Sequence, residues 1–423
     1  MNRPTDNMTA GLSSSWATLA QSISPEQQAQ VVAQAVDLLQ RQGLSLTALR
    51  DGGQLTERAR PAVIHVIARL GLAVSPQQQA ALVQQVVALA GGLGFINQLL
   101  PGRGRDPGYS EIALTPDGQV WVLRRGAPDF ERLPLTPPLA EVWRSVETLL
   151  APLGRSVSEA TPSVDAKLPR SEGMGGARVK ILHPILVPGA GFPSINIRLF
   201  EPRPVRPEQL VAWGVAPEAV IGSLVEAVSR QARLLVIGGT ATGKTTILAA
   251  LCSGIPRSAR VVKIEDPEEI WLDHPHVITI EARPAPPGSS VPPYTLRDGV
   301  DDAMRMSPRW LIVGEVRKGD AAMSLFRAQM SDHPGLSTFH AEGPEQAVFR
   351  LAVILFSDVG VEMPAARAIF AEAVDLVAQV GWLDGRRQLL GVWEVARRLD
   401  SGDVAFRCLY RPGDQTMLPI ARR

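Results

Sequence analysis

The residues with the clearest chemical potential are 238–245, which have the spacing G-x-x-x-x-G-K-[ST] of a phosphate-binding loop. Glycine lets backbone N–H groups approach phosphate oxygens, lysine supplies a cation at the β and γ phosphates, and the final hydroxyl is a ligand for Mg²⁺. An apolar run at 234–237 precedes the loop and a helix-forming run at 246–251 follows it, as such a loop requires. The sequence therefore predicts that ATP and Mg²⁺ bind here. The predicted nucleotide contacts are Gly238, Gly239, Thr240, Ala241, Thr242, Gly243, Lys244 and Thr245, with Thr245 also binding the metal.

Hydrolysis of a bound nucleotide also needs a carboxylate that orients or deprotonates water. Glu315 directly follows the apolar run 310–314, which predicts a buried strand that ends beside the phosphates. A second acidic group, residues 265–269, follows another apolar run at 261–264. Acidic residues at two neighbouring strand ends suit the placement of Mg²⁺ and water, although such a run alone more often forms a solvated loop.

Two histidines, His333 and His340, flank the strand-like segment 335–339. A single histidine is usually a core or surface residue. Two of the six histidines at the ends of one strand, one helix after Glu315, favour a functional role. The ring N–H of such a group can donate to a phosphate or to the catalytic carboxylate.

Composition limits the classes of function that the chain can have. Its 423 residues are enough for two or three domains, and a content of 45% hydrophobic and 20% charged residues is ordinary for a globular protein. A net charge of +1 and few aromatic residues argue against stable nucleic-acid binding. Cys252 and Cys408 form neither a disulfide framework nor a metal motif, which predicts a cytosolic protein. No signal peptide or transmembrane segment is evident, so we expect any membrane contact to be through a partner or a surface.

Changes in residue pattern divide the chain into segments. Ser24 and Ser75 each begin a helix with Ser at N-cap, Pro at N1 and Gln at N3, and a third helix is expected at 58–70 between them. Hairpin and strand patterns follow a Gly/Arg/Pro cluster at 101–108, and strands alternate with helices after residue 215. We predict a disordered N-terminus at 1–20, a helical module at 21–98, an α+β domain at 108–200, a stiff proline-spaced linker at 201–214, and an α/β domain with a mostly parallel sheet at 215–423.

The order of these motifs resembles that of the secretion-type traffic ATPases, which drive type II and type IV secretion, type IV and tight-adherence pili, and conjugation. The resemblance extends over most of the chain. It rests on the phosphate-binding loop, Ile264-Glu265-Asp266-x-x-Glu269, Arg305-Met306-x-Pro308, Ile312-Val313-Gly314-Glu315-Val316-Arg317, and His333 followed by Ser337-Thr338-Phe339-His340-Ala341.

The resemblance implies roles for individual residues. It implies a RecA-like fold for the C-terminal domain and adds Thr246 to the residues that bind the nucleotide. It implies that the catalytic residues are Glu315, Glu265, Glu269 and His340, with Asp266 at the metal, His333 at the nucleotide, and Arg178 and Arg198 reaching the γ-phosphate from the N-terminal domain. It also implies a homo-oligomer, expected to be a hexamer, that associates with the inner membrane through platform or secretion-machine proteins.

Some residues depart from the family pattern. Ala241-Thr242 stand where the family usually has Gly-Ser, which favours slower turnover rather than loss of binding. Ser307 and Asp332 also differ from the usual residues. Two alternatives to a motor therefore stay open. One is a nucleotide-gated scaffold with low turnover, and the other is a RecA-like nucleic-acid translocase, which would need a basic stripe that the charge balance does not supply.

Overall fold

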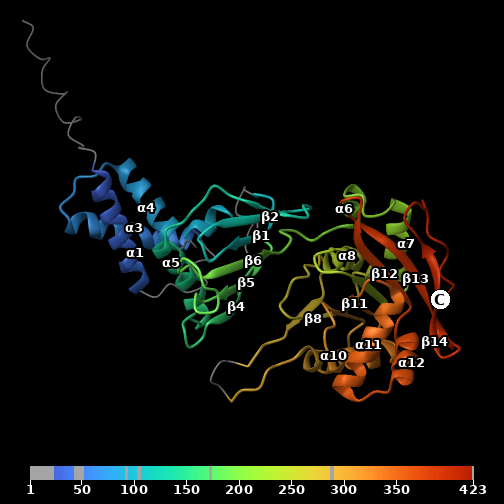
Figure 1. Ribbon diagram of the computed structural model, residues 1–423. Helices are drawn as coiled ribbons and strands as arrows, with labels where there is room; N and C mark the ends of the chain where they lie inside the picture. Colours follow the sequence, from blue (N-terminus) through green and yellow to red (C-terminus); the bar gives the residue numbers. More distant parts are fainter. Residues whose placement is uncertain are drawn as a thin grey trace, which may run out of the picture. The chain divides into compact units, whose positions relative to one another are not determined.

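The computed structural model describes residues 23–41, 52–90, 94–101, 106–170, 174–285 and 290–421. They divide into two compact units (Figure 1). The predicted disordered N-terminus at 1–20 lies outside the described residues, as do residues 102–105 of the Gly/Arg/Pro cluster at 101–108.

A three-helix module begins the first unit. Both predicted N-caps are confirmed, since the hydroxyl oxygens of Ser24 and Ser75 accept hydrogen bonds from the backbone N–H of Gln27 and Gln78, each at 3.2 Å. The apolar stripes of the three helices pack into one core that includes Val31, Val63 and Val86. The middle helix is longer than predicted. The elements are α1 (Pro25–Arg41), α3 (Gly52–Arg69) and α4 (Pro76–Ala90), followed by the 3-10 helix η1 (Gly94–Gln98).

A six-stranded sheet with the order β3-β2-β1-β6-β5-β4 follows in the chain. The sequence pattern predicts a hairpin at 111–123, a helix at 139–150 and strands at 177–182 and 194–200, and all four are present. The strands β3 and β4 were not predicted. The elements are β1 (Tyr109–Leu114), β2 (Val120–Arg124), β3 (Phe130–Arg132), α5 (Leu139–Leu150), η2 (Ala151–Leu153), β4 (Ser163–Leu168), β5 (Ala177–Leu182) and β6 (Ser194–Leu199).

The predicted linker at 201–214 contains a short helix, α6 (Pro207–Ala212). Pro207 lies at the first helical position, where its missing N–H costs nothing and its fixed φ favours the helix. Leu210 is fully buried in the core of the second unit.

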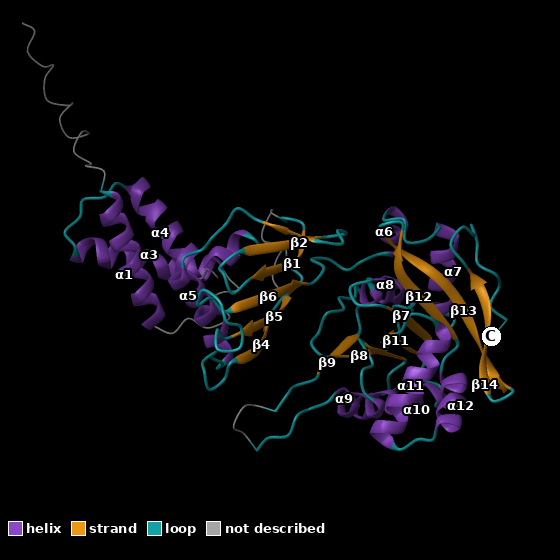
Figure 2. Ribbon diagram, in the orientation of Figure 1, coloured by secondary structure: helices purple, strands orange, loops and turns teal. Residues whose placement is uncertain are grey.

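An eight-stranded sheet forms the centre of the second unit, with the order β14-β13-β12-β7-β11-β10-β8-β9 (Figure 2). The six strands from β12 to β9 in this order are parallel, and β13 and β14 extend the sheet as an antiparallel hairpin. The strands are β7 (Leu234–Gly238), β8 (Val261–Glu265), β9 (Val277–Glu281), β10 (Trp310–Val313), β11 (Gly335–His340), β12 (Leu376–Leu383), β13 (Arg386–Asp400) and β14 (Asp403–Tyr410).

Helices cover both faces of this sheet, as Figure 2 shows. Alternate residues of β7 point to opposite faces, so Leu234 and Val236 pack with α6, α7 and α8, while Leu235 and Ile237 pack with α9 to α12. The helices are α7 (Glu218–Ser229), α8 (Lys244–Leu251), η3 (Cys252–Gly254), α9 (Leu296–Ala303), η4 (Met304–Met306), α10 (Gly319–Met330), α11 (Pro344–Val359) and α12 (Met363–Ala373).

The predicted fold class is confirmed: a mostly parallel α/β sheet is preceded by an α+β region and a helical module. The exact domain boundaries stay a prediction. The segment Lys167–Arg178 groups with the second unit, although it links two strands of the six-stranded sheet. In the described part of the chain, no helix is both long enough and apolar enough to cross a membrane.

Candidate functional site

The predicted phosphate-binding loop connects β7 to α8. Gly243 caps α8 with a left-handed backbone (φ 90°, ψ 22°), and Lys244 is the first helical residue. The Gly239 carbonyl accepts hydrogen bonds from Lys244 Nζ at 2.7 Å and from Thr242 Oγ1 at 3.0 Å. The loop therefore curls around the N-terminus of α8, where the backbone N–H groups of a first helical turn and the helix dipole favour an anion.

Left-handed backbone occurs where the family usually has glycine. Ala241 has φ 58° and Asp332 has φ 63°. An L-residue pays about 1 kcal/mol for this conformation relative to glycine. At Gly238 a side chain is excluded for another reason, since a Cβ there would lie 2.3 Å from the carbonyl oxygen of Val380 on β12.

The carboxyl edge of the sheet brings several predicted residues to the same level. His340 pairs with Gly238 in the register of β11 and β7. Glu315 follows β10 by two residues, and its neighbours Gly314 and Val316 donate backbone hydrogen bonds to Ile264 on β8 (2.9 Å) and Thr338 on β11 (3.0 Å). His340, Glu315 and Glu265 thus lie at the ends of three consecutive strands, β11, β10 and β8, on one side of the loop strand β7. This is the edge where ligands bind in open α/β sheets.

Glu315 is the more accessible of the two strand-end carboxylates. Its side chain is 28% exposed, and Oε2 accepts a hydrogen bond from Arg317 Nε at 2.6 Å. A carboxylate with this exposure can accept a proton from water or orient it. Its catalytic role stays a prediction.

Glu265 differs from that prediction because its carboxylate is turned inward and only 2% exposed. Oε1 accepts hydrogen bonds from the backbone N–H groups of Glu269 (3.1 Å) and Ile270 (2.9 Å), and Oε2 lies 2.8 Å from Lys263 Nζ. These contacts shape the acidic loop after β8. Glu265 is therefore placed to position this loop and not to act on water directly.

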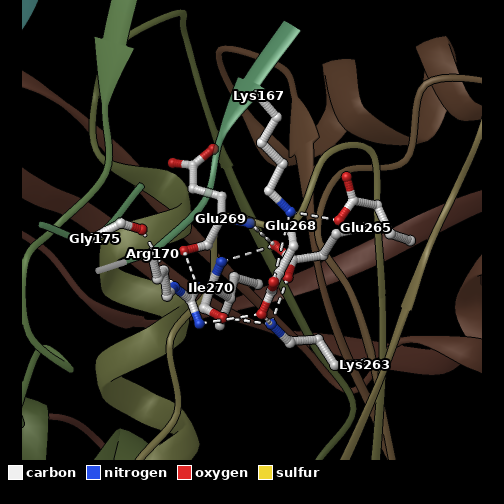
Figure 3. A network of polar contacts seen from close by, with 9 residues as sticks. Lys167, Arg170, Gly175, Lys263, Glu265, Glu268, Glu269 and Ile270 are labelled. Carbon is white, nitrogen blue, oxygen red and sulfur yellow. Dashed lines mark hydrogen bonds and ion pairs between the residues drawn. The ribbon is translucent and has the colours of Figure 1, made fainter. Parts of the chain in front are cut away.

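A network of ions surrounds this acidic loop (Figure 3). The buried Lys263 ammonium also contacts Glu268 Oε1 at 2.9 Å, and Arg170 Nη1 lies 3.1 Å from the same oxygen. Lys167 pairs with Glu268 at 3.6 Å and with Glu281. Burial raises the pKa of Glu268, but Lys263, Arg170 and Lys167 more than offset it, so the pKa is lowered.

Sequence reasoning missed this network. The available signal was Lys263 itself, a charged residue inside the apolar strand Val-Val-Lys-Ile. A buried lysine needs a partner, and a carboxylate two residues later on the same face of a strand can supply one. Cys252 lies close to the pair, and its pKa is raised to about 12, mainly by burial and further by Glu265.

The two predicted metal ligands are Thr245, which is half-buried in the first turn of α8, and Asp266, which is exposed. Glu269, predicted as a catalytic residue, is half-buried in the same acidic loop as Asp266. Their roles stay predictions. Among the described residues, no group of three or more His, Cys, Asp or Glu side chains could hold a metal by itself. A hydroxyl and a carboxylate are oxygen ligands of the kind that Mg²⁺ takes, beside waters and nucleotide phosphates.

His333 is in the wrong place for the predicted nucleotide contact. It precedes β11, whereas His340 ends it, and a six-residue strand places the two about 20 Å apart at opposite edges of the sheet. His333 Nδ1 lies 2.8 Å from the Ser331 carbonyl oxygen, and the residue lines a cavity of about 380 Å³ with Arg309 and Asp332. The predicted contact between His333 and the nucleotide is therefore wrong for a nucleotide bound in the loop of the same chain.

The two arginines lie on neighbouring strands of the six-stranded sheet. Arg178 is on β5 and half-buried, and Arg198 is on β6 and exposed. Both alternate with fully buried residues, so both belong to the less buried face of the sheet. Their predicted role at the γ-phosphate stays a prediction.

Comparison with known proteins assigns the chain to a family. A family model described as Type II/IV secretion system protein matches residues 142–379, which is more than half of the chain. A putative conjugal transfer protein of Mycobacterium tuberculosis is 28% identical over 342 residues, covering 76% of this chain and 93% of that protein. The probable conjugal transfer protein TrbB of Sinorhizobium fredii is 29% identical over 305 residues, covering 69% of this chain and 85% of that protein.

A solved structure shares the fold. The Legionella pneumophila ATPase DotB matches with a TM-score of 0.50 at 20% identity, covering 68% of this chain and 77% of that chain. The chain therefore has the phosphate-binding loop, the acidic residues at the strand ends and the parallel sheet, and it is also similar in sequence to conjugal transfer proteins over more than two thirds of its length. The chain belongs to the family of type II/IV secretion system proteins.

Proposed function

We propose that this protein is a MgATP-hydrolysing motor of a secretion, pilus-assembly or conjugation machine. Membership in the family supports nucleotide binding and ATPase activity in general. The observation that most directly supports hydrolysis at this site is the register of the sheet, which sets His340 beside Gly238 and Glu315 on the next strand. A phosphate-binding loop without a carboxylate at the same edge of the sheet would support nucleotide binding but not hydrolysis.

Each group has a proposed role in the reaction. Bound MgATP supplies a γ-phosphoryl group whose transfer to water the chain's residues promote. The N–H groups of the loop and Lys244 hold the phosphates, and Thr245 and Thr246, in the first turn of α8, contact the phosphates and Mg²⁺, with Asp266 near the metal. Glu315 orients or deprotonates water, and His340 donates a hydrogen bond to the phosphate or to Glu315. Glu265 and Lys263 keep the acidic loop, including Glu269, in position.

The motor proposal extends to assembly. We propose a homo-oligomer, as a hexameric ring, that is cytoplasmic and attached to the inner membrane through platform or secretion-machine proteins. In this proposal the α+β domain and the RecA-like domain, joined by the linker, move relative to each other as rigid bodies. Arg178 and Arg198 would then sense the γ-phosphate, and its loss would allow the α+β domain to rotate as a rigid body.

Replacing Lys244 with alanine tests the loop assignment. The change removes the only loop cation, so we expect the dissociation constant for ATP to rise about 10- to 100-fold, which is the range for lost charge-assisted hydrogen bonds. Binding of a fluorescent ATP analogue measures it. Lys180→Ala, which removes an exposed lysine paired with Asp165, is the matched control. Equal affinity of the Lys244 variant and the control would refute the assignment.

Replacing Arg198 with alanine tests the proposed γ-phosphate sensor. We expect ATP and ADP to bind within about twofold of wild type and kcat for phosphate release to fall at least about tenfold, since an arginine finger acts chiefly on the transition state. Arg132→Ala, on the exposed edge strand β3 of the same sheet, is the control and should keep the wild-type rate. An unchanged rate in the Arg198 variant would remove this residue from the site.

A nucleotide-gated scaffold is the second candidate, and the left-handed Ala241 supports it. Strain in the loop favours slow turnover without excluding binding. Wild-type protein that binds ATP but releases no phosphate above background would favour the scaffold over the motor. A nucleic-acid translocase would instead show phosphate release that single-stranded DNA stimulates and salt suppresses.

A further inference from the structure

The hairpin between β12 and β13 extends past the end of the loop strand. Val380 on β12 pairs with Gly238, the last residue of β7, and β12 then continues for three more residues. A tight turn with left-handed backbone at Asp384 (φ 50°) and Gly385 (φ 72°) reverses the chain. The hairpin tip thus lies beyond the strand that delivers the phosphate-binding loop.

One arginine of this hairpin lies against the loop. A Cβ built on Gly243 would be 3.6 Å from Arg387 Cδ, which is ordinary van der Waals contact. The cross-strand partner of Arg387 is Trp382, and the guanidinium carbon lies 4.9 Å from the centroid of that ring. A cation over an indole face is attracted to it, so the ring holds the guanidinium in place. The preceding residue, Arg386, is exposed.

This position matters because Gly243 is the N-cap of α8. The backbone N–H groups at this end of a phosphate-binding loop hold the α- and β-phosphates, and the loop lysine reaches the β- and γ-phosphates. A guanidinium extends only a few bonds beyond Cδ, and its planar fork suits two phosphate oxygens. The chain can therefore add a second cation to the phosphate site from its own hairpin.

We propose that Arg387 contacts the α- or β-phosphate of the nucleotide bound by the same chain. The proposal rests on the proposed function, because it requires a nucleotide in the loop. It assigns Arg387 to the phosphates that ADP and ATP share, whereas Arg198 is proposed to sense the γ-phosphate. The two arginines therefore differ in a measurable way.

Isothermal titration of ADP and of a non-hydrolysable ATP analogue tests this assignment on the full-length protein. We expect Arg387→Gln to raise both dissociation constants about tenfold or more, by a similar factor for the two ligands, as for a lost hydrogen bond to a charged group. Arg386→Gln is the matched control on the same hairpin and should bind both ligands like wild type. Arg387→Lys keeps the stem and the charge over Trp382 and should recover part of the affinity.

A purely structural role for Arg387 would give a different result. If the residue only packs on Trp382, Arg387→Gln would lower the melting temperature without nucleotide and leave both dissociation constants unchanged, which would overturn the inference. Loss of affinity for the ATP analogue alone would also overturn it, since that result belongs to a γ-phosphate contact. If wild type and Lys244→Ala both fail to bind nucleotide, the proposed function fails with it.

Discussion

Glu315→Gln protein is expected to bind MgATP within about twofold of wild type and to release phosphate about 10²- to 10⁴-fold more slowly, the range for loss of a general base. Glutamine keeps the size of the side chain and its hydrogen-bonding oxygen but cannot take a proton from water. The loss of its partly exposed pair with Arg317 should change stability by no more than about 1 kcal/mol. Steady-state phosphate release and equilibrium binding, measured on the same preparation, separate the chemical step from affinity.

The control for this experiment is Glu345→Gln, which changes an exposed glutamate in the first turn of α11. It should leave both measurements unchanged. A Glu315 variant with the wild-type rate would exclude this residue as the catalytic base. A wild-type protein as inactive as the variant, with intact binding, would point to the scaffold.

The largest effect on stability is expected at Lys263. Lys263→Met leaves the Glu265 carboxylate buried without its cation and should lower the free energy of unfolding by about 3–5 kcal/mol, as when one partner of a buried ion pair is removed. Glu268 would lose one of its three cations as well. Urea denaturation followed by circular dichroism measures the change.

Two further variants show whether burial is the cause. Lys180→Met breaks an exposed pair with Asp165 and should cost at most about 1 kcal/mol. In the double variant Lys263→Met/Glu265→Gln no unpaired charge is buried, so its cost should be smaller than the sum of the single changes. Two results would contradict a stabilising role for the Lys263–Glu265 pair. One is a double variant whose loss of unfolding free energy equals the sum of the two single losses, and the other is a loss below about 1 kcal/mol for Lys263→Met.

Local patterns were the features that the sequence predicted best. The loop between β7 and α8 and the capping boxes at Ser24 and Ser75 are each defined within a few consecutive residues. The parallel sheet followed from apolar runs alternating with helices, since such strands are covered on both faces. Glu315 was located because it directly follows one of these runs.

Features that depend on distant contacts were not predictable in the same way. His333 and His340 are seven residues apart in the sequence, and only the strand between them separates them to opposite edges of the sheet. The inward turn of Glu265 depends on Lys263 and on backbone N–H groups of the following loop. Arg387 is 144 positions from Gly243, and only the register of β12 with β7 brings it there.

The burial of Cys252 beside the Lys263–Glu265 pair has a practical consequence. A thiol whose pKa is raised to about 12 reacts very slowly with alkylating reagents at neutral pH, because little thiolate forms. Its modification therefore requires this part of the core to become exposed to solvent. The rate of thiol labelling at Cys252 therefore reports how often the protein interior behind the acidic loop opens to solvent. Mass spectrometry can measure this rate, with the less buried Cys408 as the internal reference.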